Sequence, residues 1–343
     1  MNQSLKLFIY AIIFLLASKN RYKPKRLILC YHRLCKYEEV SEFSITTSSK
    51  LPVEMFESHI RWLSSFCDFV SLEEITDFVD IKARRWKVSV TFDDGYSNVL
   101  KLGYPIFRRY KIPVTIFVNS FYVQNKFAHP WWDILDDIAK SFNGRIKINI
   151  FNKNLTYDFL STNDIKRFLK ETSLFLKLSS PYQREQLIDQ LRKQTKANIF
   201  ERQNEILTKV EIARNSKDPL ITFGGHSYSH TNLAACSNTE QYQEIFKDKE
   251  LLTQWTGGIV NWFSYPYGKI KYRNSTTVEY VKTAGFQGAL TLEENYLNKY
   301  TNTFEVPRLG VNAQWPPIIF KAKVLGLQVK NIIENLLTPF RLL

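Results

Sequence analysis

The chain has 343 residues, a formal net charge of +14 and a hydrophobic fraction of 44%. This length and apolar content exclude a mainly disordered chain and fit one large α/β domain or two small ones. The four cysteines include no Cys-x-x-Cys pair, which excludes a disulfide-rich scaffold and favours ordinary buried thiols.

The N-terminal segment combines a short apolar run with a basic flank. Leu7–Ala17 is apolar, but eleven helical residues span roughly 17 Å against a hydrocarbon core of about 30 Å. The first 35 residues contain seven lysines and arginines and no acid. We predict that residues 1–25 form an uncleaved interfacial anchor or signal-like segment, with a membrane-associated or cell-envelope location. A solvated basic cluster is the alternative, and the side of the membrane stays open.

Strand and helix patterns alternate over the next hundred residues. Apolar strand patterns occur at Arg26–Tyr31, Lys87–Phe92 and Ile112–Asn119. Apolar residues three and four apart predict helices at Pro52–Phe66, Leu72–Ile81 and Asn98–Tyr110. This alternation favours a parallel sheet, either doubly wound or closed into a barrel.

The alternation stops at about residue 120 and resumes after residue 217. The intervening stretch is charged, aromatic and mostly helical in pattern, most clearly at Ile165–Leu178 and Tyr182–Thr195, so we predict an insertion between two core strands. The later strands are expected at Leu220–Gly224, Val260–Tyr265 and Gln287–Thr291, with helices at Thr239–Trp255 and Thr276–Ala284. Residues 316–343 are predicted to form an amphipathic helix that packs on the domain.

Two adjacent carboxylates follow one of the predicted strands. Asp93 and Asp94 end Lys87–Phe92 and precede Gly95. In parallel α/β folds the catalytic groups gather at the C-terminal ends of the strands. At a strand end that enters a glycine turn, both carboxylates can face one cleft, where one binds a metal and the other handles protons. The alternative is a helix N-cap with a first-turn acid.

Two histidines follow a second strand. His226 and His230 are four residues apart, so one helical turn brings both imidazoles onto one face. With a carboxylate, two imidazoles leave coordination positions open on zinc or a similar ion, as in catalytic sites. Two incidental polar loop residues are the alternative. A third polar cluster, Tyr265–Gly268, follows the strand after that.

Three motifs together resemble one family. TFDDG at 91–95, GGHSYSH at 224–230 and FSYPYG at 263–268 resemble the polysaccharide deacetylase superfamily, the NodB homology domain of carbohydrate esterase family 4. The resemblance covers about residues 26–312, apart from the insertion at about 120–217. It implies a distorted (β/α)7 barrel, with a deacetylase domain at 26–315.

The resemblance also implies roles for particular residues. Asp94, His226 and His230 would bind a divalent metal, most commonly Zn²⁺, and Asp93 would be the general base. Tyr267, or its backbone amide, would stabilise the oxyanion. The implied reaction is removal of an N-acetyl group from an amino-sugar glycan by water, followed by protonation of the leaving amine. An N-acetylated glycan is therefore the expected partner, no nucleic-acid motif accompanies the positive charge, and the oligomeric state stays open.

The chain departs from the family pattern in two places. Many members carry Arg before the Pro-Tyr-Gly motif, whereas this chain has Ser264 and Tyr265. Arg308 is the candidate replacement, with a packing arginine as the alternative. The usual late Leu-x-His motif, which supplies the acid, is absent, because no histidine follows His230. His32, at the end of the first strand, resembles the branch with an early Tyr-His motif and is the candidate general acid, with a structural histidine as the alternative.

Aromatic residues near these motifs are candidates for substrate contact. Tyr265, Pro266 and Trp132 are predicted to contact the glycan. Trp131–Asp133 opens the insertion, where the rings either stack on sugars or hold the insertion to the barrel. His59 and His129 are expected to be structural or surface residues.

Two rival functions remain at this point. Because the arginine before Tyr265 is missing, the first alternative is a catalytically weak glycan-binding protein that keeps the fold. Because the chain is strongly positive, the second alternative is a helical module, centred on the insertion, that binds membranes or nucleic acid.

Overall fold

The computed structural model describes residues 25–37, 44–78, 85–125, 128–195 and 205–326. Apart from Lys25, the predicted anchor at residues 1–25 lies outside these ranges, as does most of the predicted C-terminal helix. No helix in the described part is long and apolar enough to cross a membrane.

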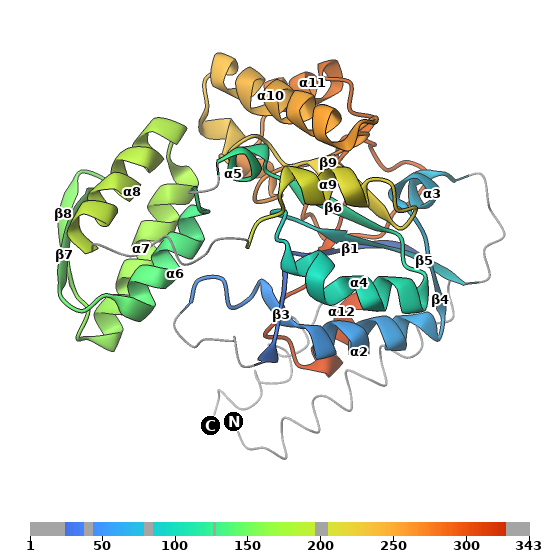
Figure 1. Ribbon diagram of the computed structural model, residues 1–343, viewed down its shortest axis with the longest axis horizontal. Helices are drawn as coiled ribbons and strands as arrows, with labels where there is room; N and C mark the ends of the chain where they lie inside the picture. Colours follow the sequence, from blue (N-terminus) through green and yellow to red (C-terminus); the bar gives the residue numbers. More distant parts are fainter. Residues whose placement is uncertain (1–24, 38–43, 79–84, 126–127, 196–204, 327–343) are drawn as a thin grey trace, which may run out of the picture.

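A curled, parallel sheet forms the centre of the fold (Figure 1). Its strands follow the order β11-β10-β9-β6-β5-β1-β12, and β4 also pairs with β5. They are β1 (Arg26–Tyr31), β4 (Cys67–Phe69), β5 (Trp86–Phe92), β6 (Val114–Val118), β9 (Ile221–Gly225), β10 (Trp262–Ser264), β11 (Gly288–Leu290) and β12 (Leu309–Gly310). Val306 pairs with Leu290, while Leu309 pairs with Leu29, so one segment bridges the two sheet edges and curls the sheet into a distorted barrel.

Helices cover the outside of this barrel because each has one apolar face. In α2, for example, Phe56, Ile60 and Leu63 are buried at spacings of four and three residues. The helices are α2 (Val53–Ser64), α3 (Leu72–Thr76), α4 (Asn98–Tyr110), α5 (Ser120–Gln124), α9 (Lys209–Asn215), α10 (Asn238–Thr256), α11 (Ser275–Thr283) and α12 (Pro317–Val324). Shorter elements lie beside the barrel strands: β2 (Arg33–Cys35) and β3 (Lys50–Pro52), which pair in parallel as a separate two-stranded sheet, and two 3₁₀ turns, Leu233–Ala235 and Ile270–Tyr272.

The helix predicted at Leu72–Ile81 is shorter than its apolar pattern indicates. α3 ends at Thr76 because Asp77 adopts an extended conformation, with a ψ of 114°. Residues 79–84 lie outside the described part. The helix start is clear, since Ser71 and Glu74 form a reciprocal capping box.

The insertion between β6 and β9 forms a separate lobe, drawn at the left of Figure 1. It contains α6 (Trp131–Ser141), β7 (Arg145–Ile150), β8 (Lys153–Asp158), α7 (Thr162–Leu178) and α8 (Pro181–Thr195). The insertion is mostly helical, as predicted, and it also contains an antiparallel hairpin that the sequence patterns do not predict. Phe151 and Asn152 close it with φ angles of 52° and 58°, as a two-residue turn with a left-handed backbone requires.

The insertion has its own apolar core. Residues of β7 alternate between exposed and buried, and Ile146, Ile148 and Ile150 face inward. They pack with Tyr157 and Phe168 in a cluster distinct from the barrel core. The lobe therefore folds around its own residues and meets the barrel at a surface.

Candidate active site

The predicted site residues follow strands that are close neighbours in the sheet. His32 comes after β1, Asp93 and Asp94 come after β5, His226 comes after β9, and Tyr267 comes after β10. Because the carboxyl ends of these parallel strands meet at one edge, the side chains converge there. They line a cavity of about 160 Å³ together with residues from elsewhere. The lining comprises His32, Ile45, Thr46, Ser49, Asp93, Asp94, Trp131, Trp132, Lys177, His226, His230, Tyr267 and Leu292.

The backbone around the cavity adopts conformations that side chains usually avoid. Asp94, Ser227, His230 and Tyr267 have φ angles of 74°, 60°, 54° and 61°. Such left-handed residues cost energy and gather at functional sites. Gly95 shares this conformation, with a φ of 70°, and an added Cβ would lie 3.1 Å from Val118 Cγ1. The tight turns after β5, β9 and β10 therefore aim side chains into the cavity.

Asp94, His226 and His230 form a buried group that could hold a cation. Their ligand atoms all lie within 4.8 Å of one another. Asp94 Oδ1 is 3.6 Å from His226 Nε2 and 3.4 Å from His230 Nε2. Among the described residues, this buried oxygen has no hydrogen-bond partner. One carboxylate and two imidazoles form a donor set that suits a catalytic metal with open coordination positions.

The orientations of the His226 and His230 rings also suit the binding of a cation. His226 Nδ1 donates to the Ser264 carbonyl at 2.6 Å, which fixes the ring so that Nε2 faces Asp94. Burial lowers the pKa of His226, but the carboxylates of Asp93 and Asp94 outweigh it and raise the pKa. The His230 ring packs edge to face against Trp132 and Tyr267, with centroid distances of 4.7 Å to each. Burial lowers the pKa of His230 to about 3, so its imidazole is neutral, the form that binds metals.

Asp93 is held by a buried arginine. Arg308 NH1 and NH2 donate to Asp93 Oδ1 and Oδ2, each at 2.8 Å, and Arg308 is fully buried. Arg308 NH2 also donates to Ser264 Oγ at 2.7 Å, and Ser264 Oγ in turn contacts Asp93 Oδ2 at 3.1 Å. Burial alone would raise the pKa of Asp93, but the Arg308 guanidinium and the nearby His226 together outweigh it and hold the pKa well below its usual range. The carboxylate is therefore ionised and fixed in orientation, by an arginine from the other end of the sequence.

A second cluster of candidate ligands lies beside the triad. Ligand atoms of Cys30, His32 and Asp93 also fall within 4.8 Å of one another. Both Asp93 oxygens are already paired with Arg308, and burial raises the pKa of the Cys30 thiol well above its ordinary value. The triad is therefore the better cation site, and His32, whose buried Nδ1 has no partner among the described residues, is available to a ligand in the cavity.

The insertion supplies one wall of the cavity through α6. Trp132 Nε1 donates to the Tyr96 hydroxyl at 2.8 Å, and that hydroxyl donates to Asp133 at 2.7 Å. Asp136, which is fully buried, accepts from the Ile45 amide at 2.8 Å and pairs with Lys50 at 3.2 Å. The hydroxyls of Ser44 and Thr46 donate to the same carboxylate. α6 therefore holds the 44–50 turn, whose residues face the triad.

Two residues predicted to contact substrate lie elsewhere. Tyr265 is 1% exposed, packs in the barrel core, and donates its hydroxyl to the Phe304 carbonyl at 3.0 Å. Pro266 is buried and is not among the residues that line the cavity. His59 stacks on Phe320 with ring centroids 3.6 Å apart, a structural position as expected. Sequence reasoning missed Lys177 and the 44–49 turn as cavity elements, and Asp136 as the residue that holds this turn, because no motif links these distant segments.

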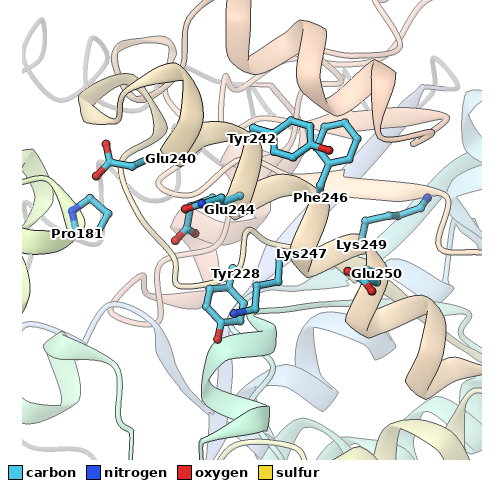
Figure 2. A pocket seen from close by; sticks show the side chains of 10 residues that line it. Pro181, Tyr228, Glu240, Tyr242, Glu244, Phe246, Lys247, Lys249 and Glu250 are labelled. Carbon is cyan, nitrogen blue, oxygen red and sulfur yellow. The ribbon is translucent and has the colours of Figure 1, made fainter.

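A larger hollow of about 850 Å³ lies along α10 (Figure 2). Figure 2 shows the Tyr242 and Phe246 rings side by side, and their centroids are 4.1 Å apart. Lys247 lies over the Tyr228 ring at 4.0 Å. None of its residues belongs to a described group that could hold a metal. The reactive groups therefore converge in the smaller cavity.

Known proteins resemble this chain in sequence and in structure. The model of the polysaccharide deacetylase family matches residues 80–171 and 182–289. The poly-beta-1,6-N-acetyl-D-glucosamine N-deacetylase of Staphylococcus aureus (strain MRSA252) is 22% identical over 304 residues, which cover 86% of this chain and 81% of that protein.

Solved structures agree with this result. The de-N-acetylase from Aggregatibacter actinomycetemcomitans superposes with a TM-score of 0.57 at 14% identity, covering 87% of this chain and 99% of that one. IcaB from Ammonifex degensii superposes with a TM-score of 0.54 at 18% identity, covering 88% of this chain and 96% of that one. The predicted distorted (β/α)7 barrel of the NodB type is confirmed.

Proposed function

The chain belongs to the polysaccharide deacetylase family, and on that premise we propose that it is a metal-dependent hydrolase of N-acetyl groups on an amino-sugar glycan. The observation that carries the proposal is the buried group of Asp94, His226 and His230 beside the ionised Asp93. These residues come from different strands, so their convergence is a property of the fold. The same convergence disfavours a protein that only binds glycans, because binding alone needs no such group.

Asp94, His226 and His230 would hold the metal. The partnerless Asp94 oxygen and the Nε2 atom of His226, which the Ser264 contact leaves free, fit this role, and Zn²⁺ suits the donor set. When bound, a divalent cation supplies Lewis acidity toward the amide carbonyl and makes water a better nucleophile at neutral pH. The remaining steps fall to other side chains of the cavity.

Asp93 accepts the proton of the attacking water. Its Oδ2 lies 3.8 Å from His226 Nε2, so the carboxylate stands next to the cation position. Arg308 holds both oxygens in one plane, which keeps the base from turning away between cycles. In this role Arg308 replaces the arginine that the family usually carries before the Pro-Tyr-Gly motif.

His32 and Tyr267 complete the proposed reaction. His32 lines the cavity from the end of β1 and delivers a proton to the leaving amine. Tyr267, in its left-handed turn after β10, stabilises the oxyanion through its hydroxyl or backbone amide. Trp132 offers a ring face to the sugar. The relatives that act on poly-beta-1,6-N-acetyl-D-glucosamine support an N-acetylglucosamine-containing substrate. The membrane-associated location stays a prediction.

The test is acetate release by the purified full-length protein from β-1,6- and β-1,4-linked N-acetylglucosamine oligomers. We expect release that stops with a chelator and returns with Zn²⁺. Asp94→Asn should lose bound metal and activity together, whereas Lys170→Met, an exposed change on α7, should keep both. Acetate release by Asp94→Asn at the wild-type rate would refute the proposed role of the triad.

A further inference from the structure

One lysine of the insertion lines the catalytic cavity. Lys177 lies in the last turn of α7 and faces the space that also contains Asp94, His226 and His230. It belongs to none of the sequence motifs. Its position therefore depends on how the insertion docks onto the barrel.

Hydrogen bonds fix the end of α7 against the segment that carries His230. The Lys177 carbonyl accepts from Asn232 Nδ2 at 3.0 Å, and Asn232 is buried two residues after His230. Nearby, the buried Arg184 of α8 donates to the His230 carbonyl at 3.2 Å and to Ser229 Oγ at 2.9 Å. The lysine is thus held in register with a proposed metal ligand.

The ammonium group of Lys177 has no ion-pair partner among the described residues. The residue is only partly exposed, and both burial and the positive charge of Lys271 lower its pKa. No carboxylate in the described part of the chain forms an ion pair with it. A half-buried cation beside a second cation is unfavourable unless a ligand brings negative charge.

This charge distribution bears on the substrate. Deacetylation converts a neutral acetamido group into an ammonium group, which the positive charge of Lys177 repels. A glycan of N-acetylglucosamine alone offers Lys177 only hydroxyl and amide oxygens. A carboxylate or phosphate on an adjacent sugar would pair with the point charge of a lysine without strict geometry.

We propose that Lys177 selects glycans that carry an anionic group, a carboxylate or a phosphate, next to the N-acetylated sugar. The inference rests on the proposed deacetylase function and narrows its substrate class. In this proposal the barrel provides the reacting groups, and the insertion provides the substrate specificity.

The test compares three tetrasaccharides: one of N-acetylglucosamine alone, one that alternates it with glucuronic acid, and one that carries a single phosphate monoester. Acetate release gives kcat and KM, and calorimetry on the metal-loaded full chain gives Kd. Lys177→Met should raise KM and Kd about tenfold for an anionic tetrasaccharide and less than twofold for the neutral one. The anionic tetrasaccharide whose KM and Kd rise in Lys177→Met shows whether Lys177 binds the carboxylate or the phosphate.

Two further variants control for misfolding. Lys177→Arg should restore the preference, because it restores the charge, and Lys170→Met on the same helix should leave it unchanged. Equal effects of Lys177→Met on neutral and anionic probes, or no effect, would overturn the role of Lys177. If no probe releases acetate but Kd still shifts only for the anionic ones, the proposed function fails and the lysine's role stands.

Discussion

The barrel and the insertion contribute to one cavity in different ways. The barrel places Asp93, Asp94, His226 and His230 at strand ends, where the parallel sheet fixes their relative positions. The insertion contributes Trp132 and Lys177 from helices with a separate apolar core. The reacting groups are thus positioned by the paired strands of the sheet. The part of the cavity wall that the insertion contributes is positioned by the contacts between the insertion and the barrel.

The docking surface contains buried ion pairs. Arg33 pairs with Asp133 at 3.5 Å, and Lys50 pairs with Asp136 at 3.2 Å. The apolar cluster of the insertion is distinct from that of the barrel, and Ile45 and Tyr267 of the barrel pack against it. Polar interfaces between regions allow relative movement more readily than large apolar ones. Changes in the barrel site should therefore abolish chemistry, and changes at the docking surface should mainly affect substrate fit.

The largest effect is expected from breaking the buried ion pair in the barrel. Arg308→Met leaves the Asp93 carboxylate buried without its partner, which typically costs about 3–5 kcal/mol in the free energy of unfolding. Deacetylation should fall to background, because the base loses both its charge partner and its orientation. Denaturant unfolding and acetate release measure the two losses.

A double variant separates these two effects. Arg308→Met combined with Asp93→Asn removes both charges and should regain much of the lost stability while remaining inactive. If Arg308→Met alone were as stable as the wild type, the pair would not be the buried, desolvated contact described above.

A smaller effect is expected at the docking surface. Asp136→Asn weakens the contacts to Lys50 and the 44–46 turn, and removing a hydrogen bond to a charged group costs about 1.5–3 kcal/mol. KM should rise about tenfold as the wall shifts, while metal content stays at the wild-type level. Metal analysis and steady-state kinetics test this.

Asp189→Asn is the matched control, because Asp189 is an exposed carboxylate of the same insertion, in a surface pair with Arg192. It should change neither stability nor KM. Loss of bound metal in Asp136→Asn would show that the insertion also positions the reacting groups. It would contradict the conclusion that the barrel alone positions them.

The difference between the barrel and the insertion also explains which site residues could be predicted from the sequence. Asp93, Asp94, His226 and His230 stand in short motifs at strand ends, so their convergence follows from the alternation of strands and helices. Arg308 was a weaker prediction, yet the guanidinium lies against Asp93 because β12 pairs with β1.

Other features depend on contacts that no local pattern encodes. Lys177 faces the cavity, and Asp136 holds the 44–46 turn beside it, only because the insertion docks in one orientation. The β7–β8 hairpin was missed although Arg145–Ile150 alternates strictly, since the surrounding helical patterns dominated the interpretation. Tyr265 was assigned to substrate by its motif, but the strand alternation turns it into the core.

The smallest effect is expected in the hollow along α10. Tyr242→Ala removes an exposed ring that stacks on Phe246, and such surface changes usually stay within about 0.5 kcal/mol of the wild-type stability. Because the hollow lies outside the cavity and contacts none of the reacting groups, kcat/KM for a tetrasaccharide should change less than twofold. The value of kcat/KM for a long polymer is measured in the same way. A tenfold loss confined to the polymer would mean that the barrel surface also holds the chain, so that specificity would not belong to the insertion alone.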